Sequence, residues 1–256
     1  MRRDPISQSI IRPAAMLGML ALAGAAQAGE VSFTESISNG VQSASATFTF
    51  NDDGPTTILT IQLTNTMTSN GGPQWLTGLF FDIAGSPTLT YDSSGLIASM
   101  ITLSGTTQTA YTTVDADHFW ALRDDLSGLP FGDQEYGLGS AGFDVFGSSD
   151  ILNFQAGGPT PQPDGTDGGI LADIAGLDIP DGHDGKPFVL GSLWLTFDLG
   201  SYDIDDAAVS DVAFVFGTGF DETVLLVPVP LALPLGLAGL AGVVLGRRRL
   251  SRVLAR

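Results

Sequence analysis

The aspartates of a Gly- and Asp-rich stretch in the second half of the chain have the spacing best suited to a chemical role. Asp164 and Asp167 stand in an Asp-Gly-Thr-Asp-Gly-Gly run, and Asp178, Asp181 and Asp184 follow in a second Asp-Gly run. Ca²⁺ binds six to eight oxygens from carboxylates and backbone carbonyls, and glycine allows the tight turns that gather them. The spacing is not that of an EF-hand loop, and Asp-Gly is also common in β-turns. We therefore expect either calcium at these five aspartates or ordinary solvated turns.

Aromatic side chains give a second candidate chemistry, because flat rings stack on the apolar faces of sugars. Trp120 and Tyr136 flank a long loop, so they are the predicted ligand-binding residues. Trp75 and Trp194 lie within or beside apolar strands and are expected in the core. The alternative is that all four rings are core residues.

Catalytic patterns are weak. His118 and His183 are the only histidines, and Leu138 stands where a G-x-S-x-G nucleophile elbow around Ser140 needs a glycine. Acidic residues cluster in one segment, but no spacing fixes two carboxyl groups across a cleft: Asp124, Asp125, Asp133, Glu135 and Asp144. We expect no enzyme activity.

Charge is strongly polarised along the 256 residues. Between Glu30 and Glu222 lie 27 acidic and 2 basic residues, a formal charge of −25, whereas the other eight basic residues stand near the two ends. Such an acidic region repels phosphate backbones, so nucleic acid is excluded as a partner. Cysteine is absent, so packing or bound metal must supply the stability.

The N-terminus resembles a secretory signal peptide over residues 1–28. Basic residues precede an apolar run from Ala14 to Ala26, and Ala26-Gln27-Ala28 fits a cleavage site. We expect export through the Sec machinery and cleavage after Ala28.

The C-terminus predicts a membrane segment. Residues 223–246 carry no charge, and the apolar run Leu231–Gly246 is followed at once by Arg247, Arg248 and Arg249. About 20 apolar residues span a bilayer core, and arginines mark the cytoplasmic side. The alternative of a buried helix fits poorly, because prolines interrupt the segment.

The tail has three parts: the proline motif, the apolar run and the arginine cluster. With the proline motif Val227, Pro228, Val229 and Pro230 it resembles the PEP-CTERM sorting signals in their VPLPA-type variant. That resemblance implies an inner-membrane-anchored precursor, recognised and cleaved near the prolines by an exosortase-type membrane protease and passed to the cell surface. The order Val-Pro-Val-Pro departs from VPLPA and leaves the exact cleavage point open.

The middle region has the period-two pattern of strands. Ala46, Phe48 and Phe50 alternate with threonines, and Leu59, Ile61 and Leu63 alternate with polar residues. Leu193, Leu195 and Phe197 repeat the apolar pattern. Runs that look buried on both faces cover 76–83 and 212–216. With no helical stripe, we predict one all-β ectodomain over 29–222, a jelly-roll-like β-sandwich, followed by a sorting tail over 223–256.

Several runs in this region resemble exosortase-dependent surface proteins of an "XDD" group: WLTGLFFDI, FWALRDDLSGLPFGDQEYGLGSAGFDVFG, PDGTDGGI and VAFVFGT. That group supplies no catalytic residues. The expected function is therefore an exported, non-enzymatic protein of the cell surface or of an extracellular biofilm matrix. Calcium-dependent carbohydrate binding or adhesion, with an extracellular polysaccharide as partner, is the alternative.

Overall fold

The computed structural model describes residues 30–52, 55–68, 75–104, 107–110, 116–147, 150–152, 167–174 and 186–228. These residues form strands and two short 3-10 helices, and none of them lies in an α-helix. The prediction of an all-β domain is confirmed. The strands are β1 (Glu30–Ser38), β2 (Ser43–Asp52), β3 (Thr57–Asn65), β4 (Trp75–Ile83), β5 (Thr90–Ser104), β6 (Thr107–Ala110), β7 (Ala121–Arg123), β8 (Tyr136–Gly139), β9 (Ile170–Leu171), β10 (Pro187–Asp198), β11 (Val209–Phe216) and β12 (Thr223–Leu226), and the helices are η1 (Ala116–Phe119) and η3 (Ile204–Asp206).

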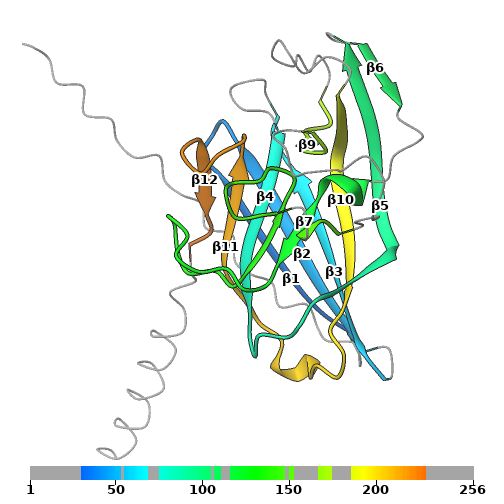
Figure 1. Cartoon of the computed structure of the whole chain (residues 1–256), viewed down its shortest axis with the longest axis vertical. Coiled ribbons are helices and arrows are strands. Elements are labelled where there is room, and N and C mark those ends of the chain that lie inside the picture. Colours follow the sequence, from blue (N-terminus) through cyan, green and yellow to red (C-terminus); the bar gives the residue numbers. More distant parts are fainter. Residues whose placement is uncertain are drawn as a thin grey trace, which may run out of the picture.

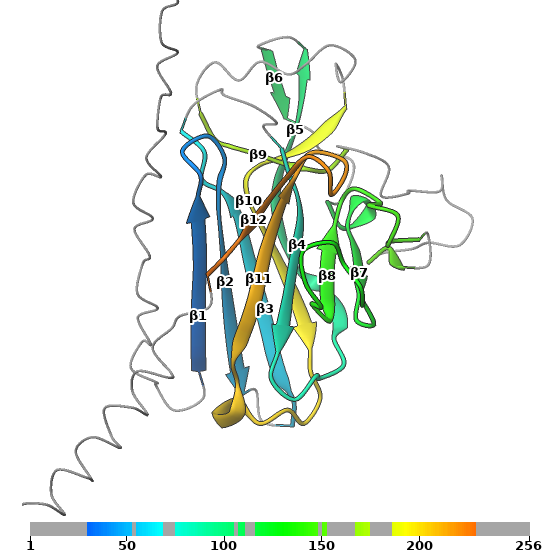
Figure 2. The ribbon, with the colours of Figure 1, turned by 90° about the vertical axis from the view of Figure 1, so that its left-hand side faces the viewer.

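The strands belong to one continuous, barrel-like sheet (Figures 1 and 2). Its main path runs β1-β2-β3-β10-β9-β4-β11-β12, and β12 returns to contact β1. Side strands extend it, because β5 also pairs with β10 and carries β6, while β8 pairs with β4 and carries β7. The two separate sheets of the predicted jelly-roll-like sandwich are not confirmed, since hydrogen bonding continues through β9.

The two-residue strand β9 joins the two halves of the sheet. It pairs in parallel with β10, through Ile170 opposite Val189, and antiparallel with β4, through Leu171 opposite Trp75. The side-chain amide of Asn65 donates to the Ile170 carbonyl at 2.8 Å. The joint therefore rests on few strand residues and one buried side-chain hydrogen bond.

The period-two prediction for β2, β3 and β10 is confirmed. The apolar members of each strand point into the core and are at most 1% exposed, whereas the polar members between them are half-buried: Ala46, Phe48, Phe50, Leu59, Ile61, Leu63, Leu193, Leu195 and Phe197. Across the core they meet β4 and β11, with the Phe48 and Phe81 rings 5.0 Å apart. Burial of each such ring removes 150–250 Å² of apolar surface from water, which is the main force holding the two halves together.

Strand β4 and residues 212–216 of β11 are buried on both faces, as predicted. The inner face contributes Leu79 and Phe214 to the main core, and the outer face contributes Phe80 and Val215 to a second apolar cluster. The segment from β7 to residue 147 covers that outer face (Figure 1). The long loop expected beside Trp120 and Tyr136 is thus an ordered covering layer that includes β8.

The last strand extends beyond the predicted domain boundary. Residues Thr223–Leu226, assigned by sequence to the tail, form β12 and pair with β11. The next residue, Val227, still donates its backbone N–H to the Val212 carbonyl at 2.9 Å. Within the residues described, no helix is long and apolar enough to cross a membrane, and the predicted apolar segment 231–246 lies outside them.

Candidate functional site

Trp120 and Tyr136, the predicted ligand-binding aromatics, are core residues. Trp120 is fully buried and its indole Nε1 donates to the Gly168 carbonyl at 3.0 Å. Tyr136 is 1% exposed, stacks on Phe81 with centroids 5.5 Å apart and donates its hydroxyl to the Pro87 carbonyl at 2.6 Å. Burial raises the pKa of the Tyr136 hydroxyl well above its usual range. Neither ring offers a face to solvent, so the expectation of a sugar platform at these two residues is wrong.

Of the five aspartates predicted to bind calcium, only Asp167 lies among the described residues. Its Oδ2 pairs with the Lys186 ammonium at 2.9 Å, so a cation there would compete with that ion pair. The remaining four lie outside the described residues: Asp164, Asp178, Asp181 and Asp184. Within the part of the chain that the structure describes, no three acidic or histidine side chains are grouped to hold a metal ion. Calcium binding stays a prediction.

The structure describes only two of the residues that were predicted to take part in processing. Val227 is half-buried and Pro228 is exposed, directly after the last strand. The rest lie outside the described residues: Ala26, Ala28, Val229, Pro230, Arg247, Arg248 and Arg249.

His118 lies in the 3-10 helix η1. Its Nδ1 is 3.1 Å from Oδ1 of the buried Asp117, although the two atoms are not aligned as a hydrogen bond. The other oxygen of Asp117 accepts the Tyr91 hydroxyl at 3.0 Å and so ties η1 to β5. Ser140, the weak nucleophile candidate, is fully buried. In the described structure, Asp117 therefore anchors η1 to β5.

The acidic residues of the covering layer are tied to the protein rather than paired across a cleft. Asp82 on β4 accepts the backbone N–H of Glu135 at 2.6 Å, and Arg123 holds Asp125. Burial raises the pKa of Asp82, and the negative charges of Asp211, Glu135 and Asp133 raise it further against the effect of that hydrogen bond. The arrangement fastens the covering layer to β4.

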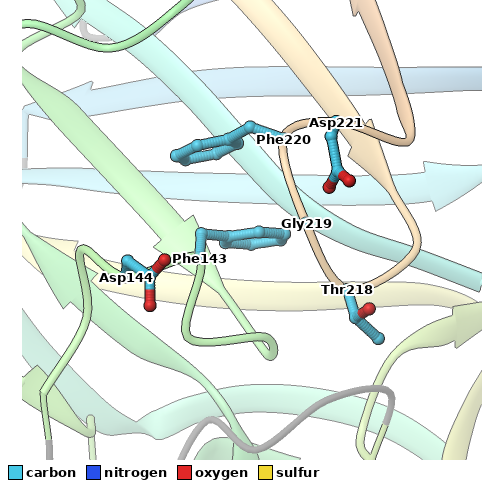
Figure 3. Close-up of a pocket in the computed structure, with 6 residues that line it drawn as sticks. All are labelled: Phe143, Asp144, Thr218, Gly219, Phe220 and Asp221. Atoms are coloured by element: carbon cyan, nitrogen blue, oxygen red, sulfur yellow. The ribbon is translucent and has the colours of Figure 1, made fainter.

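A shallow hollow of about 290 Å³ lies where the covering layer meets the turn before β12 (Figure 3). Its lining combines stacked rings with carboxylates: Phe143, Asp144, Thr218, Gly219, Phe220 and Asp221. The rings of Phe143 and Phe220 stack on each other at 5.0 Å and 10°, so no ligand ring fits between them. Phe143 and Asp144 adopt left-handed backbone angles, with φ of 50° and 62°, at a cost of about 1–3 kcal/mol each. That strained turn places the Phe143 ring against Phe80 and Phe220.

The outer face of β1, β2, β3 and β10 carries a regular array of hydroxyl groups. Strand register aligns twelve outward positions in three rows across the four strands. Ten of the twelve are serine or threonine, and the other two are Gln62 and Trp194. We call this surface the hydroxyl face; its rows are Ser32-Thr49-Thr60-Thr196, Thr34-Thr47-Gln62-Trp194 and Ser36-Ser45-Thr64-Ser192.

Local sequence explains why these residues form this face. Threonine has high β-propensity, and outward threonines alternate with inward apolar residues along each strand. Facing hydroxyls bond across the strands, with Ser32 and Thr49 3.1 Å apart, Thr34 and Thr47 3.0 Å apart, and Thr64 and Ser192 2.8 Å apart. From general strand spacings the face measures about 14 Å by 14 Å.

The hydroxyl face carries no charge at any of its twelve positions, although the acidic region holds 27 carboxylates. Charges resume one row beyond, at Glu30 and Asp198, and beside the first row on β5, where Asp92 stands opposite Thr196. Ordinary protein surfaces intersperse charged residues, and depletion of charge is typical of the centre of a binding interface. The hydroxyl face is therefore the candidate site.

Trp194 is the aromatic side chain of this face, contrary to its expected place in the core. It is half-buried and stands opposite Gln62 on one side and Ile97 of β5 on the other. Ile97 is 63% exposed, the highest fraction among the large apolar side chains described. The sequence contains a signal for the outward position of Trp194, because this residue lies between Leu193 and Leu195, which point inward.

No family model, curated protein or solved structure matches the chain.

Proposed function

We propose that this chain is an exported, non-enzymatic interaction protein displayed at the cell envelope surface or in an extracellular matrix. In this proposal the Sec machinery exports it, signal peptide 1–28 is removed, and the C-terminal segment anchors the precursor in the inner membrane. An exosortase-type protease then cleaves the tail near Val227–Pro230. The β domain, for which a sandwich-like arrangement of the two facing halves stays a prediction, is the part displayed.

The observation that carries the interaction role is the uncharged hydroxyl face. A surface protein with 27 acidic residues gains solubility from its charge, so charge is expected on every solvated face. Twelve adjoining positions without one are better explained by a partner that covers them.

The position of the tail is compatible with processing. Among the described residues, Val227 makes the last backbone hydrogen bond of the sheet region, and the proline motif begins at the same residue. A cut after Pro228 removes no hydrogen bond of the described sheet, so the domain would keep its fold after release.

Mass spectrometry of the protein recovered from cell fractions tests the proposal. We expect an N-terminus at Gly29 and a C-terminus near residues 227–230 in the surface or medium fraction. A variant with Pro228 and Pro230 replaced by alanine should stay in the membrane fraction with Arg256 intact, whereas Pro87→Ala, outside the motif, should be processed normally. A freely soluble cytoplasmic chain that begins at Met1 and ends at Arg256 would contradict the proposal.

Calcium-dependent carbohydrate binding is the second candidate function, because the hydroxyl face suits a carbohydrate. Its calcium part predicts that millimolar Ca²⁺ raises the melting temperature, since a ligand that binds only the folded state stabilises it. An unchanged melting temperature would remove calcium from this candidate.

A further inference from the structure

We propose that the hydroxyl face binds a neutral polysaccharide without calcium, and that the sugar rings lie along the row Thr34-Thr47-Gln62-Trp194. This inference rests on the proposed function and names the partner of the same surface.

Charge selects the class of partner. The domain carries −25 in total, but the twelve positions of the hydroxyl face are uncharged, so an anionic polymer would meet the surrounding carboxylates without any cation on the face to bind it. A cationic partner would gain nothing there either, because the acids lie outside the face. Charge complementarity therefore favours an electrically neutral chain.

Hydroxyl chemistry selects the same class. Each serine or threonine hydroxyl donates one hydrogen bond and accepts others, and sugar hydroxyls have the same dual capacity. Because Thr34 bonds Thr47 and Thr64 bonds Ser192, the side chains are held in place before a ligand arrives. Such preorganisation lowers the entropy cost of binding.

The middle row adds an apolar contact. Trp194 stands at its end, beside the exposed Ile97 of β5. Sugars present C–H faces that pack on an indole ring. On the neighbouring row, Gly95 of β5 lies so close to Thr196 that a methyl group there would overlap its side chain. This contact places β5 against Thr196 at the end of the first row.

A second copy of the chain fits this surface poorly. Pairing two hydroxyl faces would bring two domains of −25 together, and the face is short of the apolar area that stable homodimers bury.

The experiment is a depletion assay with full-length protein in mild detergent and EDTA. The probes are four neutral polysaccharides (cellulose, mannan, xylan with its acidic groups removed and cross-linked dextran) and, as the acidic counterpart, alginate beads. We expect depletion by at least one neutral polysaccharide and none by alginate. Trp194→Ala should weaken binding about tenfold, the loss of a good aromatic contact.

Thr47→Glu places a charge at the centre of the hydroxyl face and should abolish binding. Its matched control is Thr88→Glu, which adds the same charge at an exposed position off the face and should bind as the unaltered protein does. Equal melting temperatures for the two glutamate variants would separate a loss of binding from a loss of folding, and Trp194→Tyr should restore most of the affinity lost in Trp194→Ala.

Binding to none of the four neutral polysaccharides would overturn the inference. Equal binding of alginate, loss of binding in EDTA, or unaltered binding by Thr47→Glu would overturn it as well. A dimer in solution that Thr47→Glu dissociates would assign the face to a second copy instead. These outcomes leave the proposed function standing if the tail is processed at the surface. An unprocessed cytoplasmic chain would remove the proposed function, while binding by the purified protein would still be measured.

Discussion

The indole Nε1 of Trp120 donates a hydrogen bond to the carbonyl oxygen of Gly168, 3.0 Å away and 48 residues later in the chain. Gly168 adopts a φ of +79°, and a side chain there would overlap Phe119. The bond fixes the end of η1 to the segment that leads into β9. Trp120, which was predicted to bind a ligand, thus connects two distant parts of the fold.

Replacing Trp120 tests this structural role. Trp120→Phe keeps a buried ring but leaves the Gly168 carbonyl without its donor, and we expect the free energy of unfolding to fall by about 1–3 kcal/mol. Urea denaturation measures the change. Trp194→Phe, on the outer face, should cost about 0.5 kcal/mol or less. Equal losses for both variants would contradict the assignment of Trp120 to the core.

Glu35 is expected to make the stability of the β domain depend on pH. It occupies an inward position of β1, opposite Ala46, and burial raises its pKa. A raised pKa in the folded state means that folding favours the protonated carboxyl. The contribution of the protonated carboxyl to stability is therefore complete at acidic pH and is lost as the pH rises through the folded pKa. Glu35→Gln should therefore increase the melting temperature at pH 7 and leave it unchanged below about pH 4. Glu30→Gln, an exposed change on the same strand, serves as the charge-matched control.

Two substitutions of Asp82 separate the effect of its hydrogen bond from the effect of its charge. Asp82→Asn keeps an acceptor for the Glu135 N–H and removes a carboxylate whose pKa is raised by burial and by neighbouring acids. We expect it to match or exceed the stability of the unaltered protein at pH 7. Asp82→Ala removes the acceptor and should lower the free energy of unfolding by about 1–2 kcal/mol. If alanine proves as stable as asparagine, the hydrogen bond does not fasten the covering layer.

Gly137 tests how closely the covering layer packs on β4. A Cβ at this position would lie 2.6 Å from Leu126 Cδ1 and 2.8 Å from Phe80 Cε1. Gly137→Ala should therefore lower the free energy of unfolding by about 1–3 kcal/mol through overpacking. In Gly219→Ala the added methyl group meets mainly the exposed carboxylate of Asp221, which can move aside. Chemical denaturation of the pair should show a clear loss only for Gly137→Ala.

Sequence patterns predicted the local features well, because alternation along a strand depends only on neighbouring residues. The inward positions of β2, β3 and β10 followed from it, and the same alternation places Trp194 outward, although its size suggested the core. Pairing between distant strands carries no such local signal. The bridge at β9 and the burial of Tyr136 under Pro87 depend on contacts between residues far apart in sequence. The hydroxyl face likewise required the register of four strands before its rows were visible.

The two-residue bridge at β9 has a mechanical consequence. The hydroxyl face lies on β1, β2, β3 and β10, whereas the chain leaves the sheet through β12 on the other side of β9. Tension between a bound polymer and the C-terminal attachment would cross that short joint, the contact between β12 and β1, and the apolar contact between the halves. Under load, we expect the molecule to yield there first, with the four-strand half parting from β4, β11 and β12 as one unit.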